Sequence, residues 1–320
     1  MVNVKVRSCC KMPVVSVIIP THNRAQFLYS AIASVLNQTY QDFEILVIDD
    51  NSKDNTQEVV KNFHDTRIKY IRHEKNKGEA GTRNTGIKHS NGRYIAFLDD
   101  DDEWLPEKLE LQIDLLQNSP QEVGCIYTGF LTVDETKRKV LQRSIPSKRG
   151  YIYYDMFIRN YIGKPSTVML KKECFKRIDL FDENIAFGTD YDMWIRISRD
   201  FHIDYIEKPM VLYCKHKNAL SADLAVRNKG MEMLFKKHNR FFMLNRKGHG
   251  EFYMYLGIFY CCAGDVRKGR KALLKAITLY PFQIRSYCNL GLSFLNAGKF
   301  IKAREFRVRC YSLLRSLFHT

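Results

Sequence analysis

Long apolar runs are absent from this sequence, and so are the common metal and phosphate motifs. Its most apolar late stretch, residues 252–263, is shorter than the about 20 residues that a membrane-spanning helix needs. Residues 1–13 are mixed in character and do not resemble a secretory signal. We therefore expect a soluble, cytoplasmic protein that at most lies peripherally on the inner face of the plasma membrane.

Cysteine spacing excludes further classes of site. The nine cysteines form no CxxC pair, so neither a zinc ribbon nor a thioredoxin-like motif is supported. Scattered cysteines of this kind are typical of small buried side chains in a reducing compartment. The sequence also has no GxGxxG, no Walker loop and no HExxH, which excludes the usual dinucleotide, P-loop and zinc-protease signatures.

Acidic residues are scarce only in the C-terminal third. The 320 residues include 51 Lys+Arg and 35 Asp+Glu, a formal net charge of +16. Residues 1–214 carry 30 of each kind, whereas residues 215–320 carry 21 basic and 5 acidic side chains. With 45% hydrophobic and 27% charged residues, the composition is that of a globular protein and excludes a largely disordered chain. A neutral body therefore precedes a basic tail, and we expect the two to serve different purposes.

Strand and helix patterns alternate through the first half of the chain. Short apolar runs end at proline or aspartate, and each is followed by residues with helical spacing. This alternation implies βαβ units with right-handed crossovers, and hence an α/β fold with a mostly parallel sheet. We expect strands at residues 14–19, 44–48, 68–71 and 94–98, helices at 25–36, just after Asp54, at 81–89 and at 106–116, shorter strands over 124–140, and one or two amphipathic helices over 221–244.

Polar residues follow three of the expected strands at the point where each strand ends. They are Thr21-His22-Asn23, Asp49-Asp50 and the run Asp99–Asp102. Ligands of parallel sheets bind outside the carboxyl ends of the strands. We therefore expect these three groups to converge on one rim.

Four consecutive aspartates at a strand end predict a cation site. Adjacent carboxylates repel one another, and hard divalent cations such as Mg²⁺ and Mn²⁺ prefer carboxylate oxygen and often share substrate phosphates. The alternative is a solvated acidic loop in which Asp102 caps the next helix. The run ends an apolar strand and faces other polar strand ends, which favours the cation site.

Two further positions are open to more than one interpretation. Arg83 stands near a helix start, where it could contact a phosphate or simply lie on the surface. Asp190 heads an amphipathic helix, where a carboxylate could be a general base or a helix cap.

The tail contains an internal repeat. Leu256-Gly257 recurs as Leu290-Gly291, and Ala263-Gly264 recurs as Ala297-Gly298, each 34 residues later. This is the tetratricopeptide period, with small residues where two helices pack closely. The alternative is two unrelated helical hairpins. We expect a catalytic domain at residues 1–245 and a tetratricopeptide-like helical region at residues 246–320.

Taken in order, the motifs resemble one family. They are VSVIIPTHNR at residues 15–24, IDDNS at 48–52, NKG at 76–78, RNTG at 83–86, FLDDDDEW at 97–104 and TDYDMW at 189–194. Together they are similar to the family 2 glycosyltransferases, which have the GT-A fold. The resemblance covers about residues 13–217.

The resemblance implies an activity. Such enzymes transfer a sugar from a nucleotide diphosphate donor, commonly a UDP-sugar, with inversion at the anomeric carbon, using Mn²⁺ or Mg²⁺. The acceptor would be a hydroxyl of a glycan or lipid-linked molecule, in bacterial cell-envelope polysaccharide assembly.

The resemblance also implies roles for individual residues. Asp50 matches the aspartate that binds uracil, and Asp190 matches the proposed catalytic base, although Thr189 replaces the usual Glu before it. The other implied contacts to the donor are Pro20, Thr21 and Asn23 to the nucleoside, Arg83 to the diphosphate, and Asp99 and Asp101 of the DXD motif to the metal. Asp100 between them would contact the nucleotide-sugar, and it makes the register of the motif ambiguous by one residue. His216 would lie near the metal or diphosphate, and the alternative is a buried structural histidine.

Rival functions remain open. A sugar nucleotidyltransferase would need a Gly-rich GTR loop directly after the first strand, and Gly81-Thr82-Arg83 comes too late for it. A catalytically degenerate adaptor or binding module built on the same fold is the second alternative. For the basic tail we expect a partner, which could be an anionic membrane surface, a lipid-pyrophosphate-linked acceptor, an acidic polymer or another protein. The alternative is that the basic residues only form a solvated helix face. We expect no nucleic-acid partner.

Overall fold

The computed structural model describes residues 12–136, 139–185, 187–216 and 224–303. It divides into two compact units. The first holds the residues up to Tyr151 together with Ile162–Phe181 and Asp200–Lys215, and the second holds Ile152–Tyr161, Asp182–Arg199 and the residues from His216 onward. The division between domains at residues 245 and 246 stays a prediction.

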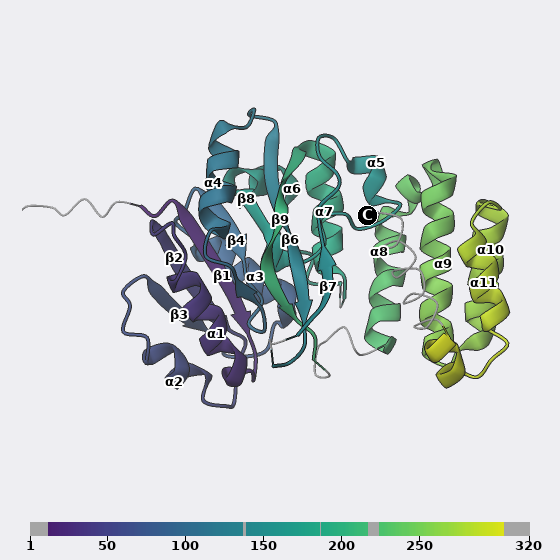
Figure 1. The fold of residues 1–320 in the computed structure, drawn as a ribbon, viewed down its shortest axis with the longest axis horizontal. Helices are drawn as coiled ribbons and strands as arrows, with labels where there is room; N and C mark the ends of the chain where they lie inside the picture. The colour runs from purple at the N-terminus through teal and green to yellow at the C-terminus, as the bar shows by residue number, and fades with distance from the viewer. Residues whose placement is uncertain (1–11, 137–138, 186, 217–223, 304–320) are drawn as a thin grey trace, which may run out of the picture. The chain divides into compact units, whose positions relative to one another are not determined.

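The first unit is built on one mixed sheet. Its strand order is β3-β2-β1-β4-β8-β6-β9-β5, with β7 paired to β6. The neighbours β3, β2, β1 and β4 run parallel, whereas β8 is antiparallel to both β4 and β6 (Figure 1). The strands are β1 (Val15–Thr21), β2 (Phe43–Asp49), β3 (Ile68–Arg72), β4 (Tyr94–Phe97), β5 (Glu103–Trp104), β6 (Val123–Val133), β7 (Val140–Ser144), β8 (Val168–Lys171) and β9 (His202–Cys214).

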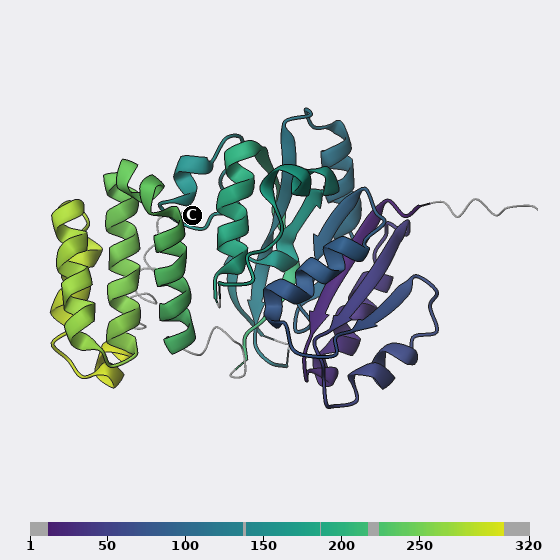
Figure 2. The same ribbon diagram turned by 180° about the vertical axis from the view of Figure 1, so that it is seen from behind.

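Helices cover both faces of this sheet. Val17 and Ile19 of β1 belong to one apolar cluster with Leu28 of α1, whereas Ile18 points the other way, toward Gly86 of α3. A Cβ on Gly86 would lie 2.4 Å from Ile18 Cγ2, so α3 approaches β1 more closely than a side chain allows. Figure 2 shows α3 in front of the sheet in the view from behind. The helices of this unit are α1 (Ala25–Leu36), α2 (Thr56–Lys61), α3 (Gly78–His89), α4 (Lys108–Asn118) and the short α6 (Phe175–Ile178).

The sequence predicted most of these elements. Helix α1 has the predicted bounds, β2 extends one residue beyond the expected strand at each end, and β3 and β4 differ by one residue at one end. Helix α3 begins at Gly78, three residues before the predicted start, and Gly78 adopts a φ of +73° that glycine tolerates. Strand β5 was not predicted, since two residues carry no periodicity, and it forms only by pairing with β9.

The second unit is helical in its described residues. The predicted helical region at 221–244 is a single described helix, α8, while residues 221–223 lie outside the described part. The helices are α5 (Tyr153–Met156), α7 (Thr189–Asp200), α8 (Leu224–Leu244), α9 (Arg246–Cys262), α10 (Val266–Leu279) and α11 (Ile284–Leu292). Among all described helices, none has the length and apolar character needed to cross a membrane.

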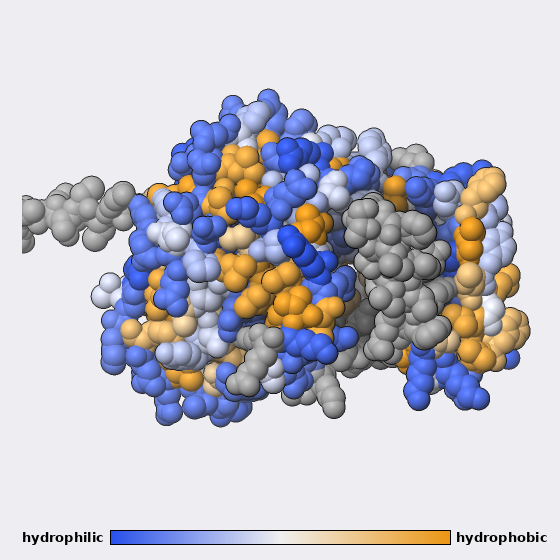
Figure 3. Space-filling model, viewed as in Figure 1, coloured by the Kyte–Doolittle hydropathy of each residue, from blue (hydrophilic) through white to orange (hydrophobic). Residues whose placement is uncertain are grey.

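Two helices pack closely in the first copy of the tail repeat. A Cβ on Gly257 of α9 would lie 2.7 Å from Leu273 Cγ and 2.9 Å from the carbonyl oxygen of Gly269, both on α10. The small residue at Gly257 is therefore required for this packing. Around Gly291 of α11, a Cβ would meet none of the described residues within 4 Å, and the position 34 residues after Leu273 lies outside them, so the tetratricopeptide assignment stays a prediction. Apolar surface gathers over α10 and α11 in Figure 3. The side chain of Phe282, between these two helices in sequence, is 85% exposed.

Candidate functional site

The predicted convergence of strand ends is confirmed by backbone contacts. Thr21 of β1 pairs with Asp49 of β2, and the amide of Asp50 donates to the carbonyl of Thr21 over 2.9 Å. On the other side of β1, the amide of Leu98 donates to the carbonyl of Ile18 over 3.0 Å. The acidic run that starts at Asp99 therefore begins beside the end of β1.

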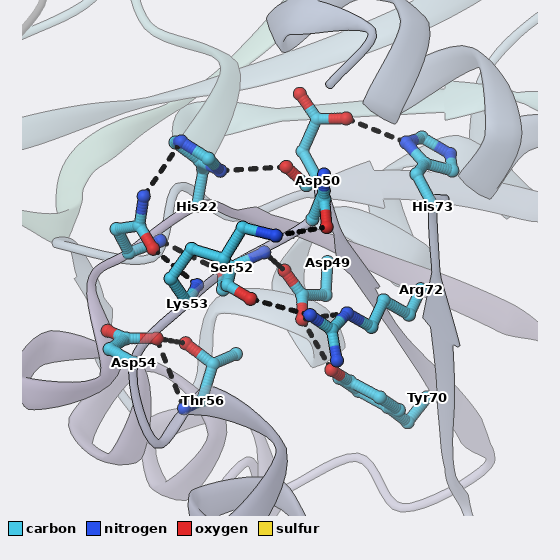
Figure 4. A network of polar contacts seen from close by, with 12 residues as sticks. His22, Asp49, Asp50, Ser52, Lys53, Asp54, Thr56, Tyr70, Arg72 and His73 are labelled. Atoms are coloured by element: carbon cyan, nitrogen blue, oxygen red, sulfur yellow. Dashed lines mark hydrogen bonds and ion pairs between the residues drawn. The ribbon is translucent and has the colours of Figure 1, made fainter. Parts of the chain in front are cut away.

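Asp50 organises the loop between β3 and α3. Its carboxylate accepts hydrogen bonds from the amides of Lys77 (2.8 Å) and Gly78 (2.9 Å). His73 Nδ1 lies 2.8 Å from Asp50 Oδ1 (Figure 4), and His73 Nε2 lies 2.9 Å from Thr85 Oγ1. An ionised carboxylate can only accept, so the imidazole is the donor to Asp50. The sequence analysis missed His73, although it directly follows β3 and the strand-end rule could have found it.

Asp49 points away from Asp50 and serves the fold. Its Oδ1 accepts from the amide of Ser52 over 2.8 Å, and its Oδ2 accepts from the Tyr70 hydroxyl (Figure 4). Burial and this bond to Asp49 raise the pKa of Tyr70 well above its usual value. Because successive strand residues face opposite sides, only one of the two aspartates can face the rim.

The loop after β1 is tied to the loop after β2. The amide of Asn23 donates to Ser52 Oγ over 2.9 Å, and Asn23 Oδ1 accepts from the amide of Lys53 over 2.6 Å. Asn23 has a φ of +53°, in the left-handed region that asparagine tolerates better than most residues. Thr21 is buried and Pro20 is half-buried beside them. These predicted nucleoside contacts therefore do lie together, on a loop that is held in place by its neighbour.

The carboxylate at each end of the predicted DXD motif forms an ion pair with an arginine. Arg83 Nη2 lies 2.6 Å from Asp99 Oδ1, and Arg24 Nη1 lies 2.9 Å from Asp101 Oδ2 and 3.2 Å from Asp100 Oδ1. The sequence analysis did not single out Arg24, because nothing local shows that its side chain reaches a carboxylate 77 positions later.

Burial dominates the titration of these aspartates. It raises the pKa of Asp99 despite the opposing charge of Arg83, and the charges of Glu79 and Asp101 raise it further. Burial likewise raises the pKa of Asp100 to about 7, although Arg24 acts in the opposite direction. A cation bound beside these carboxylates would favour their ionised forms.

Asp102 does not belong to the rim. Its carboxylate accepts from Ser166 Oγ over 2.6 Å and from the amide of Cys214 over 3.2 Å, inside the unit. The alternative in which Asp102 caps the next helix is wrong, because α4 begins only at Lys108. With Asp102 bonded internally, the register that uses Asp99 and Asp101 is favoured.

Arg83 is an interior residue. Its side chain is fully buried, with Nη2 2.6 Å from Glu79 Oε1 as well as from Asp99, and its guanidinium lies 5.6 Å from the centre of the Phe181 ring. The alternative of a surface arginine is therefore wrong. A buried guanidinium beside a strand-end carboxylate is suited to receiving an anion.

The second unit holds the other two predicted residues. Asp190 lies in the first turn of α7 and is half-buried. His216 lies two residues after the end of β9 and is buried. Because they belong to a different unit from the acidic run, their roles as base and as metal or diphosphate contact stay predictions.

Asp192, two residues after Asp190, forms a buried network that sequence reasoning missed. It lies 2.8 Å from His238 Nε2, 3.0 Å from Lys237 Nζ and 2.9 Å from Arg196 Nη2, which joins α7 to α8. Burial would raise the pKa of Asp192, but the bond from His238 and the charges of Arg196 and Lys237 outweigh it and lower the pKa to about 2. The start of α7 is thereby fixed within its unit.

The donor set at the rim fits a hard divalent cation. Among the described residues, no three His, Cys, Asp or Glu side chains are already arranged around a metal position. Mg²⁺ bound with a nucleotide, however, needs only one or two carboxylates, since substrate phosphates and waters supply its other ligands. Asp99 and Asp101 can provide this pair.

A comparison with known protein families identifies the family of this chain. Residues 16–179 match the sequence model of glycosyl transferase family 2. The chain belongs to this family.

Curated relatives are glycosyltransferases as well. Over 192 residues the chain is 34% identical to the UDP-Glc:alpha-D-GlcNAc-diphosphoundecaprenol beta-1,3-glucosyltransferase WfgD of Escherichia coli, covering 60% of this chain and 72% of that protein. It is 40% identical over 185 residues to an uncharacterized glycosyltransferase of Rickettsia bellii, covering 58% of this chain and only 26% of that protein. The chain thus spans very different shares of its relatives' lengths.

Solved structures confirm the α/β GT-A fold class. The mannosyltransferase PcManGT of Pyrobaculum calidifontis, in complex with GDP-Man and Mn²⁺, aligns with a TM-score of 0.60 and 16% identity, covering 92% of this chain and 87% of that one. TarS of S. aureus (residues 1–349), in complex with UDP-GlcNAc, aligns with a TM-score of 0.58 and 17% identity, covering 90% and 92%. At these identities the likeness establishes the fold.

Proposed function

We propose that this glycosyltransferase moves a sugar from a UDP-sugar to a hydroxyl of a lipid-linked or glycan acceptor, with inversion, in cell-envelope polysaccharide assembly. One observation carries the proposal: Asp99 and Asp101 stand at the end of β4, each paired with an arginine, while Asp50 stands two strands away on the same rim. The relatives named for UDP-glucose and a diphosphoundecaprenol-linked acceptor support the choice of donor and acceptor. So does TarS in complex with UDP-GlcNAc.

Asp50 would bind the base. Its carboxylate accepts from the amides of Lys77 and Gly78 and from His73, so it is oriented before any ligand arrives. An imide N–H such as that of uracil would complete its coordination as a further donor. Pro20, Thr21 and Asn23 would line the nucleoside beside it.

Asp99 and Asp101 would hold the metal, and His216 and Asp100 would stand near it and the nucleotide-sugar. A bound divalent cation would supply charge neutralisation on the leaving nucleotide diphosphate. Arg83 would contact the diphosphate, since its buried guanidinium remains charged and can share its hydrogen bonds between Asp99 and a phosphate oxygen. This preorganised positive charge would be the larger contribution to catalysis.

Asp190 would be the general base. A carboxylate in the first turn of α7 would accept the proton of the acceptor hydroxyl as that oxygen attacks the anomeric carbon opposite the diphosphate, which inverts the configuration. An ordinary ionised carboxylate suffices, because the proton moves as the new bond forms. The Asp192 network that fixes the start of α7 supports this role.

For the basic tail we propose attraction to an anionic membrane surface. Its support is the concentration of 21 basic against 5 acidic residues in positions 215–320, together with exposed apolar side chains such as Phe282 and Ile284 among them. Cosedimentation of the protein with phosphatidylglycerol vesicles, and not with phosphatidylcholine vesicles, would bear this out.

Calorimetry with UDP tests the proposal against the adaptor alternative. We expect UDP to bind in the presence of Mn²⁺ and to bind at least tenfold more weakly without it. Asp101→Asn should remove this metal dependence, whereas Asp114→Asn on the exposed side of α4 should not. Absence of metal-dependent binding in the folded wild-type protein would favour a degenerate adaptor.

A further inference from the structure

Arg24 stands where it would compete with a metal ion for the carboxylates of Asp100 and Asp101. Its Nη1 lies 2.9 Å from Asp101 Oδ2 and 3.2 Å from Asp100 Oδ1. The two carboxylates are nearly buried, with side chains 12% and 4% exposed, whereas the side chain of Arg24 is 26% exposed. The guanidinium is thus the more accessible member of the cluster.

The position of Arg24 on the backbone adds to this picture. It directly follows Asn23 and directly precedes α1, and its side chain reaches the acidic run after β4. Its side chain therefore bridges the end of β1 to the acidic run after β4. Without a bound metal, the positive charge of Arg24 stabilises the carboxylates of Asp100 and Asp101, which a divalent cation would otherwise stabilise.

We infer that Arg24 neutralises the carboxylate of Asp101 when no metal is bound. Arg24 thereby couples metal binding to nucleotide binding. The inference rests on the proposed metal–nucleotide site. Without nucleotide, a cation that approaches Asp101 meets the charge of Arg24, so the metal alone binds weakly. When a nucleotide diphosphate arrives, its oxygens offer the guanidinium an alternative anionic partner, and Arg24 releases Asp101 to the metal.

The coupling is reciprocal by thermodynamic necessity. If the nucleotide strengthens metal binding by some factor, the metal strengthens nucleotide binding by the same factor. Removal of the charge at Arg24 should therefore change three quantities in a fixed pattern. The metal alone should bind more tightly, the nucleotide should bind more weakly in the presence of metal, and the coupling factor should fall.

The test measures Mn²⁺ binding by electron paramagnetic resonance, with and without UDP, at low ionic strength. We expect Arg24→Gln to bind Mn²⁺ alone about tenfold more tightly than wild type, and UDP to strengthen its Mn²⁺ binding less than in wild type. Arg24→Lys, which keeps the charge, should stay close to wild type. Arg67→Gln is the matched control, since it removes a similarly exposed arginine that pairs with Asp65.

Each outcome has a distinct meaning. Unchanged or weaker binding of Mn²⁺ alone by Arg24→Gln overturns the inference, since it makes Arg24 a structural partner that merely orients Asp101. A similar gain in Arg67→Gln also overturns it, because the effect would then come from net charge. If wild type binds no Mn²⁺ even with UDP, the proposed metal site itself fails, and the inference fails with it. An unfolded Arg24→Gln leaves Arg24→Lys as the test, and a tenfold tightening in Arg24→Lys would contradict the account.

Discussion

The buried guanidinium of Arg83 and the carboxylate of Asp99 form an ion pair 2.6 Å long that joins α3 to the end of β4. The pair connects two motifs that lie 16 positions apart in the sequence. It also places the proposed diphosphate contact directly beside a proposed metal ligand. Stability and ligand binding should therefore both depend on it.

Arg83→Met should destabilise the protein more than the double variant with Asp99→Asn. Removal of one member of a buried pair leaves the other charge uncompensated, which costs about 3–5 kcal/mol. The second change removes that charge, so part of the loss is recovered, and UDP binding stays weak in both. Urea unfolding of the two single variants and the double variant measures this coupling. Losses that simply add would contradict a direct interaction.

Asp50→Asn should loosen the loop between β3 and α3. The carboxylate accepts three hydrogen bonds, and an asparagine has one acceptor oxygen and an amide group that repels the donors of Lys77 and Gly78. We expect a loss of about 1–3 kcal/mol of stability and at least a tenfold weaker affinity for UDP. Faster hydrogen exchange at the amides of Lys77 and Gly78 reports the loop directly. Asp65→Asn in the turn before β3 serves as the control.

Gly86→Ala tests the close contact of α3 with β1. The new Cβ would lie 2.4 Å from Ile18 Cγ2, so one of the two elements must shift, at a cost of about 1–3 kcal/mol. Combination with Ile18→Ala should cost less than the sum of the two changes, because the clash disappears. Gly291→Ala in α11, where a Cβ would meet none of the described residues within 4 Å, should be neutral or slightly stabilising. Equal effects at the two glycines would contradict this packing.

The sequence predicted those site residues that a neighbouring sequence pattern marks, and it did not predict residues whose partners are distant along the chain. Strand ends are readable from apolar runs, so Asp50, Asp99 and Asp101 were found before any contact was known. His73, which directly follows β3, could have been found by the same rule, whereas Arg24 could not, because its carboxylate partner Asp101 lies 77 positions later. The same applies to Asp192, whose partner His238 lies on another helix 46 positions later.

The Asp192 network should make stability depend on pH at the acid end. The pKa of Asp192 lies near 2 in the folded protein against 3.8 ordinarily, so the folded state favours its ionised form. This contribution, about 2 kcal/mol, is present above about pH 4 and is lost as the pH falls toward 2. The difference in unfolding free energy between wild type and Asp192→Asn should shrink over that interval. A difference that stays constant from pH 5 to pH 2 would show that the charge of Asp192 does not contribute.

The proposed activity is sugar transfer in which Asp99 and Asp101 hold the metal and Asp190 of α7 is the general base. The most direct measurement offers a panel of UDP- and GDP-sugars with Mn²⁺ or Mg²⁺ and a GlcNAc-diphospho-lipid acceptor, and records release of the nucleotide diphosphate. We predict that at least one donor is consumed only with metal, that the product has inverted anomeric configuration, and that Asp190→Asn binds UDP normally but transfers no sugar. Turnover by Asp190→Asn near the wild-type rate would remove Asp190 as the base. Release from no donor by a folded, UDP-binding wild-type protein would contradict the account.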